Sequence, residues 1–234
     1  MGRGKYRWGQ DFMRKNGVLV GRPVWDSKRY RFAIPNKIWD HRLKPIAFMI
    51  FSYLCYCNSN HPANMISPDD VARGTHVTVS TAKKYLSVLV NTGLVSADLS
   101  LTSSLQCGRS ENFFSLPNEI FLLKLPPSAF MVYAYLLLIE DRKTHTCHPS
   151  YNTIATATGM SKNTALKNIS VLLETGLITV EPSSYFDRRG MKWKGNNLYT
   201  ILPIHSAVGI FHQRQLRRLE LDVARSSLAA QAAV

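Results

Sequence analysis

Lys162, Asn163 and Lys167 stand within one short segment, SKNTALKNISVLLETGLI, which spans residues 161–178. The apolar residues of this segment recur at helical spacing, so a helix here turns the three polar side chains to its opposite face. A lysine ammonium group can donate to guanine O6 and N7, and an asparagine amide can pair with adenine through two hydrogen bonds. The segment therefore predicts a helix that reads base edges in duplex DNA. The alternative is an ordinary solvated helix face.

Two hydroxyl side chains accompany these residues. Ser161 and Thr164 are short enough to contact phosphate oxygens, which position a protein on DNA without reading its sequence. Asn168 and Ser170 are further candidates for the outward face of the same helix.

A second segment, TVSTAKKYLSVLVNTGLV, offers similar chemistry over residues 78–95. Helical spacing turns Val79, Ser80, Lys83 and Lys84 outward. Ser80 stands where the other segment has an asparagine, and the first outward residue is apolar. We therefore expect this helix to read fewer base edges, and a solvated face is again the alternative.

A basic, glycine-containing loop follows the segment of residues 161–178. Charge at the tip of a hairpin is expected to touch the DNA backbone or the minor groove. The alternatives are an exposed hairpin without a partner and an inward-packed tryptophan. The loop residues assigned to DNA are Arg188, Arg189, Lys192, Trp193 and Lys194.

Half of the net charge lies at the N-terminus. The chain has 29 Lys and Arg against 15 Asp and Glu, which gives +14, and residues 1–31 hold nine of the basic and two of the acidic residues. The region shows no sustained helical or strand period and is predicted to be a flexible basic extension that follows phosphates or enters a minor groove. A tail that only aids solubility is the alternative. The residues assigned to DNA are Arg3, Lys5, Arg7, Arg14 and Lys15.

The chain repeats itself. Residues 32–54 recur at an offset of 82, with RFAIPNKIW matched by FFSLPNEIF, and residues 72–94 recur at an offset of 83. Matches of this length and order indicate two copies of one fold.

Each copy predicts the same series of elements. A strand ending in proline precedes a buried helix, a short helix capped by Ser67 or Ser150, a turn, and a third helix that ends at Gly93 or Gly176. A β-hairpin follows the second copy, and NFFSLP, residues 112–117, is expected both to return the hairpin of the first copy and to open the second. The predicted fold is mainly α with small β-hairpins, as tandem winged helix-turn-helix domains. The predicted division is a basic arm (1–31), winged-helix domains 1 (32–113) and 2 (114–203), and a helical tail (204–234).

Four stretches, LPNEIF, LPPSAFMVYAYLL, HPSYNTIATATGMSKNTALKNISVLLETGLI and GNNLYTI, together resemble the N-terminal winged-helix domain of the RepA family of plasmid replication initiators. They also resemble helix-turn-helix proteins of bacterial mobile elements. The resemblance covers residues 114–203 and, through the repeat, 32–113. It implies a DNA-contacting Ser/Thr-x-x-Thr-x-x-basic pattern on Ser161, Thr164 and Lys167, and on Thr78, Thr81 and Lys84.

No catalytic constellation is evident. There is no GxxxxGK[ST] phosphate loop, and the cluster His145, Cys147 and His148 has no second ligand group at zinc-finger spacing, so it is expected to be a surface loop. Four cysteines in a chain of this length do not suggest a disulfide framework, and no apolar run is long enough to span a bilayer. We expect no enzyme activity, cofactor, metal or membrane partner, and a cytoplasmic location on a bacterial nucleoid or plasmid.

The residues thus predict a sequence-specific double-stranded DNA-binding protein, and the resemblance favours a replication initiator of a plasmid or mobile element. A transcriptional regulator with the same readout, and a scaffold that recruits replication or segregation machinery, are the alternatives. The tail carries Leu216, Leu219 and Val223 on one side of an expected helix. It is a candidate for pairing with a second copy of the chain, for covering a domain, or for fraying.

Overall fold

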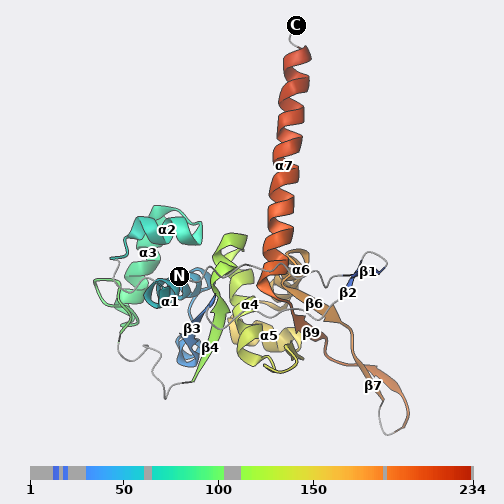
Figure 1. Cartoon of the computed structure of the whole chain (residues 1–234). Helices are drawn as coiled ribbons and strands as arrows, with labels where there is room; N and C mark the ends of the chain where they lie inside the picture. Colours follow the sequence, from blue (N-terminus) through green and yellow to red (C-terminus); the bar gives the residue numbers. More distant parts are fainter. Residues whose placement is uncertain are drawn as a thin grey trace, which may run out of the picture.

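The computed structural model of the chain describes residues 13–15, 18–20, 30–60, 65–102, 112–186 and 189–232. These residues form helices and small antiparallel sheets (Figure 1). Two groups of elements lie side by side, and one long helix rises from the second group.

The first group follows the predicted order. Strand β3 (Arg31–Pro35) leads into a 3-10 segment, η2 (Asn36–His41), and then into the helices α1 (Pro45–Asn60), α2 (Pro68–Thr75) and α3 (Val79–Asn91). Proline suits the first turn of α1 and α2 because the amide hydrogens there have no partner within the helix.

The second group repeats this order. Strand β4 (Phe113–Pro117) leads into η4 (Asn118–Leu123), followed by α4 (Pro127–Ile139), α5 (Tyr151–Thr158) and α6 (Lys162–Glu174). The predicted short helix, turn and third helix are therefore confirmed here as α5, a turn and α6.

The predicted caps form hydrogen bonds. The Ser67 hydroxyl accepts from the Asp70 amide at 3.2 Å while the Asp70 carboxylate accepts from the Ser67 amide at 3.1 Å, which makes a capping box. Gly93 and Gly176 take positive φ angles of 70° and 74° just after α3 and α6. Local sequence alone thus sets where these helices begin and end.

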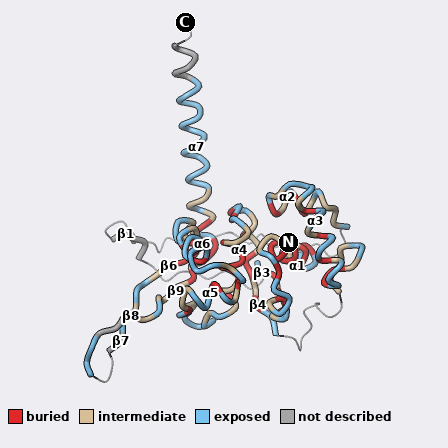
Figure 2. Tube along the Cα trace, turned by 180° about the vertical axis from the view of Figure 1, so that it is seen from behind, coloured by how far each residue is buried: buried red, intermediate tan, exposed pale blue. Residues whose placement is uncertain are grey.

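The hydrophobic core is built on α1 and α4. Both helices are buried almost all round, and Figure 2 shows the buried residues gathered in the middle of the molecule. An apolar residue on every side of a helix requires neighbours on every side. Each central helix meets this requirement by packing against the other and against its own group.

The strand β4 corrects one prediction. It was expected to return the hairpin of the first copy, but it pairs antiparallel with β3, with Phe32 opposite Leu116 and Ile34 opposite Phe114. After α3, the described residues instead form a single bridge between Val95 and Leu101. All four of the paired β3 and β4 side chains are buried, so apolar burial favours this partner.

The second copy carries a larger sheet. Strands β6 (Ile178–Glu181) and β9 (Leu198–Ile201) pair antiparallel as predicted, and β5 (Thr146–Cys147) joins the other side of β9. Beyond them, β7 (Ser184–Phe186) and β8 (Lys192–Lys194) extend the hairpin outward (Figure 1).

Strand β5 corrects the expectation of a surface loop at His145, Cys147 and His148. Cys147 pairs with Tyr199 of β9 in the sheet and is buried, and desolvation raises the pKa of its thiol to about 12. His145 lies 3.2 Å from the Glu140 carboxylate through Nδ1. The described cysteines, Cys55, Cys57 and Cys147, form no disulfide, and Cys107 lies outside the described residues.

The N-terminal region also differs from expectation. Strands β1 (Met13–Lys15) and β2 (Val18–Val20) pair antiparallel, although no strand was predicted there. The sequence signal was Asn16-Gly17, a dipeptide favoured between hairpin strands. Arg31 was expected in the basic arm but belongs to β3, which pairs with β4. Its guanidinium donates to the Ser115 side chain and carbonyl of β4 at 3.0 and 2.6 Å.

The C-terminal helix α7 (Ile204–Ala232) confirms the predicted helical tail. Ile204 and Ala207 are buried at its base, and the Arg214 guanidinium donates to the Glu174 carbonyl at 2.6 Å. Every residue from 212 to 226 is exposed, Leu216 and Leu219 included, so the apolar side of the tail contacts no described part of the chain (Figure 2).

Candidate nucleic-acid interface

The outward face of α6 is the centre of the candidate interface. Ala165, Ile169 and Leu172 point into the core, as predicted. Lys162, Asn163, Lys167 and Ser170 are all exposed, as the helical spacing predicts.

Asn168 was expected on this face and is not there. Its side chain is 5% exposed, its Oδ1 accepts from the Ser128 hydroxyl at 3.0 Å, and its Nδ2 donates to the Met160 sulfur at 3.5 Å. Position 168 lies directly beside the apolar stripe, on the side that faces α4. Asn168 therefore joins two helices and the turn between α5 and α6, and does not face DNA.

The corresponding face of α3 is also open. Ser80, Lys83 and Lys84 are exposed, and Val79 is 36% exposed. The Lys84 ammonium lies 5.9 Å from the ring centroid of Tyr85, close enough for a cation–π contact. The structure thus leaves each predicted residue of this helix accessible to a ligand.

Two of the four predicted hydroxyl groups, those of Thr78 and Ser161, cap helices. Thr78 accepts the amide hydrogen of Thr81, and Ser161 accepts that of Thr164, each at 3.2 Å. These bonds cap the first turns of α3 and α6. The hydroxyls of Thr78 and Thr81 also bond each other at 2.7 Å, and those of Ser161 and Thr164 at 2.8 Å. A hydroxyl has a single hydrogen to donate, so within each pair at most one hydroxyl can donate to a phosphate oxygen.

Acidic residues are absent from most of both helix-turn-helix segments, and the first segment has Asp69 and Asp70 only at the start of α2. No Asp or Glu occurs in residues 71–97 or in residues 142–173. The first stretch contains α3 and the second contains α5 and α6 up to its last turn. Their accessible surface is therefore neutral or positive throughout, which suits a polyanion.

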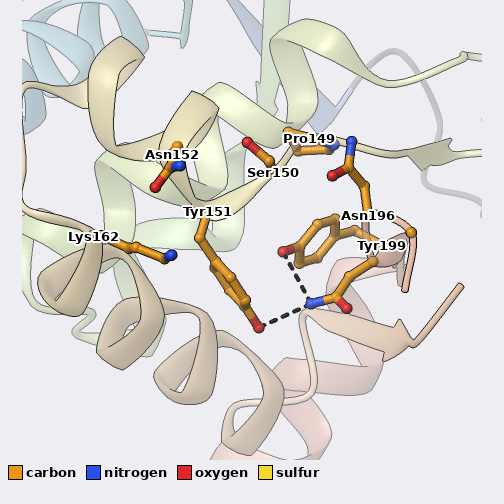
Figure 3. Close-up of a pocket in the computed structure, with 9 residues that line it drawn as sticks. Pro149, Ser150, Tyr151, Asn152, Lys162, Asn196 and Tyr199 are labelled. Atoms are coloured by element: carbon orange, nitrogen blue, oxygen red, sulfur yellow. Dashed lines mark hydrogen bonds between the residues drawn. The ribbon is translucent and has the colours of Figure 1, made fainter. Parts of the chain in front are cut away.

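A small polar hollow lies beside the start of α6 (Figure 3). It has a volume of about 160 Å³ and is lined from three sides: the start of α5, the first residue of α6, and the end of the hairpin. Lys162 was predicted as a DNA-binding residue, whereas the rest of this lining was not. The polar lining residues that sequence reasoning missed are Ser150, Tyr151, Asn152, Asn196 and Asn197.

Asn197 links the hairpin to α5 at the edge of this hollow. Its Nδ2 donates to the Tyr151 hydroxyl at 2.9 Å and lies 3.5 Å from the Tyr199 hydroxyl (Figure 3). Burial raises the pKa of Tyr199 to about 12, so its hydroxyl keeps its proton at neutral pH. The base of the hairpin is thereby fixed against the first turn of α5. The signal in the sequence was NNLY directly after a basic loop.

The hairpin itself is described in part. Arg189 is exposed, and β8 carries Lys192, Trp193 and Lys194, with Trp193 opposite Tyr185 in the strand register. Arg188 lies outside the described residues.

Most of the N-terminal predictions lie outside the described residues. This holds for Arg3, Lys5 and Arg7, whereas Arg14 and Lys15 belong to β1. The assignment of all five to DNA stays a prediction.

Two further observations concern the described residues. Within them, no three His, Cys, Asp or Glu side chains gather as a set of metal ligands. Among the helices described, none combines the length and the apolar character needed to cross a membrane.

Comparison with known proteins supports a helix-turn-helix domain in the second group of elements. Residues 123–178 match the family described as a helix-turn-helix domain, a range that holds α4, α5 and α6. In such domains the last helix of the motif enters the major groove, so the match supports DNA binding. No curated protein matches the chain. A solved structure titled a possible transcriptional regulator from Methanosarcina mazei Go1 is 15% identical, with a TM-score of 0.31, covering 51% of this chain and 94% of that one.

Proposed function

We propose that the chain is a sequence-specific double-stranded DNA-binding protein built from two winged helix-turn-helix domains in tandem. The observation that carries this proposal is the outward face of α6, where Lys162, Asn163 and Lys167 are exposed within a helix-turn-helix domain. These side chains supply the donors that guanine and the amide pair that adenine requires. No catalytic step is needed for such a role, and we propose that the protein is not an enzyme.

The phosphate contacts in this proposal come from around the reading helix. The hydroxyls of Ser161 and Thr164 bond each other, which leaves one hydroxyl hydrogen for a phosphate oxygen at the start of α6. The hollow beside Lys162 brings polar groups of α5 and the hairpin to the same place. Arg189 is exposed on the hairpin, and we assign Lys192 and Lys194, which belong to β8, to the same role. Such contacts fix the register of a protein on the duplex, while the α6 side chains distinguish its sequence.

The biological role that we propose is replication initiation on a plasmid or mobile element. Its support is the resemblance of residues 114–203 to the winged-helix domain of the RepA initiators. A transcriptional regulator would use the same groove chemistry. Footprinting on the DNA of the source separates them, because an initiator protects repeated sites at an origin and a regulator protects a promoter.

Fluorescence anisotropy tests DNA binding itself. Full-length protein is titrated with a duplex selected from a random pool and with an unselected duplex, each at 50 to 200 mM salt. Contact with about 6–10 phosphates predicts a loss of about 10³–10⁵ in affinity over this range. Absence of binding to any duplex at 50 mM salt would overturn the proposal in favour of a protein-interaction scaffold.

A further inference from the structure

The two copies meet through residues that correspond to each other in the repeat. In the β3–β4 pair, Ala33 lies opposite Ser115, its own equivalent at the offset of 82. Phe32 lies opposite Leu116, and Ile34, the equivalent of Leu116, lies opposite Phe114, the equivalent of Phe32. An antiparallel strand pair with this register has a local two-fold axis between Ala33 and Ser115.

The central helices follow the same axis. Phe48 of α1 and Phe130 of α4 are equivalents, and their ring centroids are 6.2 Å apart. A residue meets its own equivalent only where a two-fold axis passes close by. The strand pair and the helix pair thus indicate one common axis.

Ring contacts farther from the axis occur in exchanged pairs. Trp39 contacts Tyr135 edge-on at 5.7 Å, and Phe121 contacts Tyr53 edge-on at 5.1 Å. Phe121 is the equivalent of Trp39, and Tyr135 is the equivalent of Tyr53. Likewise, the Trp39–Phe114 distance of 6.3 Å corresponds to 5.9 Å for Phe121 and Phe32. Each of these two ring contacts from the first copy to the second thus has a counterpart in the reverse direction.

The interface between the copies therefore has the form of an isologous dimer interface within a single chain. The same axis that exchanges α1 with α4 also exchanges α3 with α6, because each third helix packs on its own central helix. Proteins that place two helices related by a two-fold axis on DNA bind half-sites that are inverted about the same axis.

From this geometry we infer that a single chain binds a DNA site made of two half-sites in inverted orientation, one read by α6 and one by α3. The inference rests on the proposed function and specifies its target. It excludes two half-sites in direct repeat, since direct repeats require copies related by translation.

The two half-sites are unequal. Three equivalent outward positions differ in chemistry: Lys162 corresponds to Val79, Asn163 to Ser80, and Leu166 to Lys83. Lys167 and Lys84 are the same residue type at equivalent positions. We therefore expect an imperfect palindrome, with one shared base preference and an adenine contact in the α6 half alone.

Selection from a random duplex pool with the full-length protein tests this inference. The motif recovered is split into its halves, and duplexes are made with one half, two inverted halves or two direct halves, over a series of spacings. We expect the inverted pair to bind about tenfold tighter than the direct pair. The best spacing is expected near one helical turn, about 10 base pairs, or a multiple of it.

Matched variants assign each half. Lys84→Ala should relax base preference in one half, and Lys167→Ala, the equivalent change, should relax it in the other. Ser80→Asn should make the recovered motif more palindromic, because it gives α3 the amide of α6. Circular dichroism checks that the variants keep the helices of the parent.

The outcomes distinguish this inference from the proposed function. Salt-sensitive, sequence-specific binding to one half alone, or equally to direct repeats, overturns the inverted arrangement and leaves DNA binding intact. A one-half duplex that recruits a second duplex overturns it as well, because α3 and α6 then occupy separate molecules. Failure to enrich any sequence, with no binding at low salt, overturns both.

Discussion

At the scale of single residues, position along a helix decides what a polar side chain does. Asn163 and Asn168 are identical in chemistry and five residues apart on α6. Asn163 is exposed, whereas Asn168 is 5% exposed and bonded to Ser128. At 100° per residue, Asn163 lies nearly opposite the stripe formed by Ala165, Ile169 and Leu172, whereas Asn168 lies directly beside this stripe, where α4 packs. The residue type alone could not predict this difference.

The reading role of α6 gives the first prediction. Changing Asn163 and Lys167 together to alanine should lower the ratio of specific to non-specific affinity by tenfold or more, since each bidentate pairing with a base contributes about 1–3 kcal/mol of discrimination. The measurement is anisotropy against the selected and an unselected duplex. Lys143→Ala removes one exposed charge outside α6 and should change both affinities alike. Full specificity in the double variant would show that another element reads the bases.

The capping box of α2 gives a prediction about pH. Hydrogen bonds from Ser67 hold the pKa of Asp70 below its ordinary value. A lowered pKa means that the stabilisation is complete above about 3.9, the unfolded value, and is lost as the pH falls through the folded value. Asp70→Ala should therefore lower the melting temperature at pH 7, and the difference from the parent should vanish in acid.

The control for this change is Asp69→Ala. It removes an exposed carboxylate from the same turn and leaves the box intact, so its effect should be smaller. A difference between Asp70→Ala and the parent that is constant from pH 7 to pH 2 would contradict the assignment.

At the scale of elements, local sequence signals predict the helices but do not predict which strands pair when those strands are far apart in the sequence. Capping serines, prolines in first turns and glycines at helix ends are local, and the structure has each of them where the sequence places it. The alternating pattern of Phe113–Pro117 fits any partner strand equally well, so the pairing with Arg31–Pro35 could not be read from it. Strand β5 has two residues, too few for any period to show.

The glycines after α3 and α6 give a prediction for the junction with α7. Gly93 and Gly176 share a positive φ, so alanine at either position costs about 1–2 kcal/mol of backbone strain. A Cβ at Gly176 would also lie 2.5 Å from Cδ1 of Ile210, whereas no described atom lies within 4 Å of a Cβ at Gly93. Gly176→Ala should therefore destabilise the protein more than Gly93→Ala does in denaturant unfolding.

A second substitution isolates the packing against α7. Ile210→Ala removes the clashing carbon, so the extra cost of Gly176→Ala over Gly93→Ala should shrink in that background. An unchanged difference would mean that α7 does not pack on Gly176 in solution.

At the scale of the whole molecule, the core is symmetric and the elements around it are not. The core relates α3 and α6, the two helices that we propose to read DNA, and the elements outside the core break its symmetry. The long hairpin and α7 belong to the second copy alone among the described residues (Figure 1). The first copy has the shorter Val95–Leu101 bridge after α3. The two copies therefore differ in the elements that follow their third helices, which fits the imperfect palindrome that we infer.

The N-terminal charge gives the prediction that belongs to this scale. Deleting residues 1–28 removes seven basic and two acidic residues and leaves β3 in place. Phosphate contacts carry no sequence information, so affinity for selected and unselected duplexes should fall by the same factor. The slope of log affinity against log salt should flatten by about 0.9 for each phosphate that the shortened protein no longer neutralises. A change in the ratio of the two affinities would instead mean that this region reads bases, for example from the minor groove, and an unchanged slope would mean that it only aids solubility.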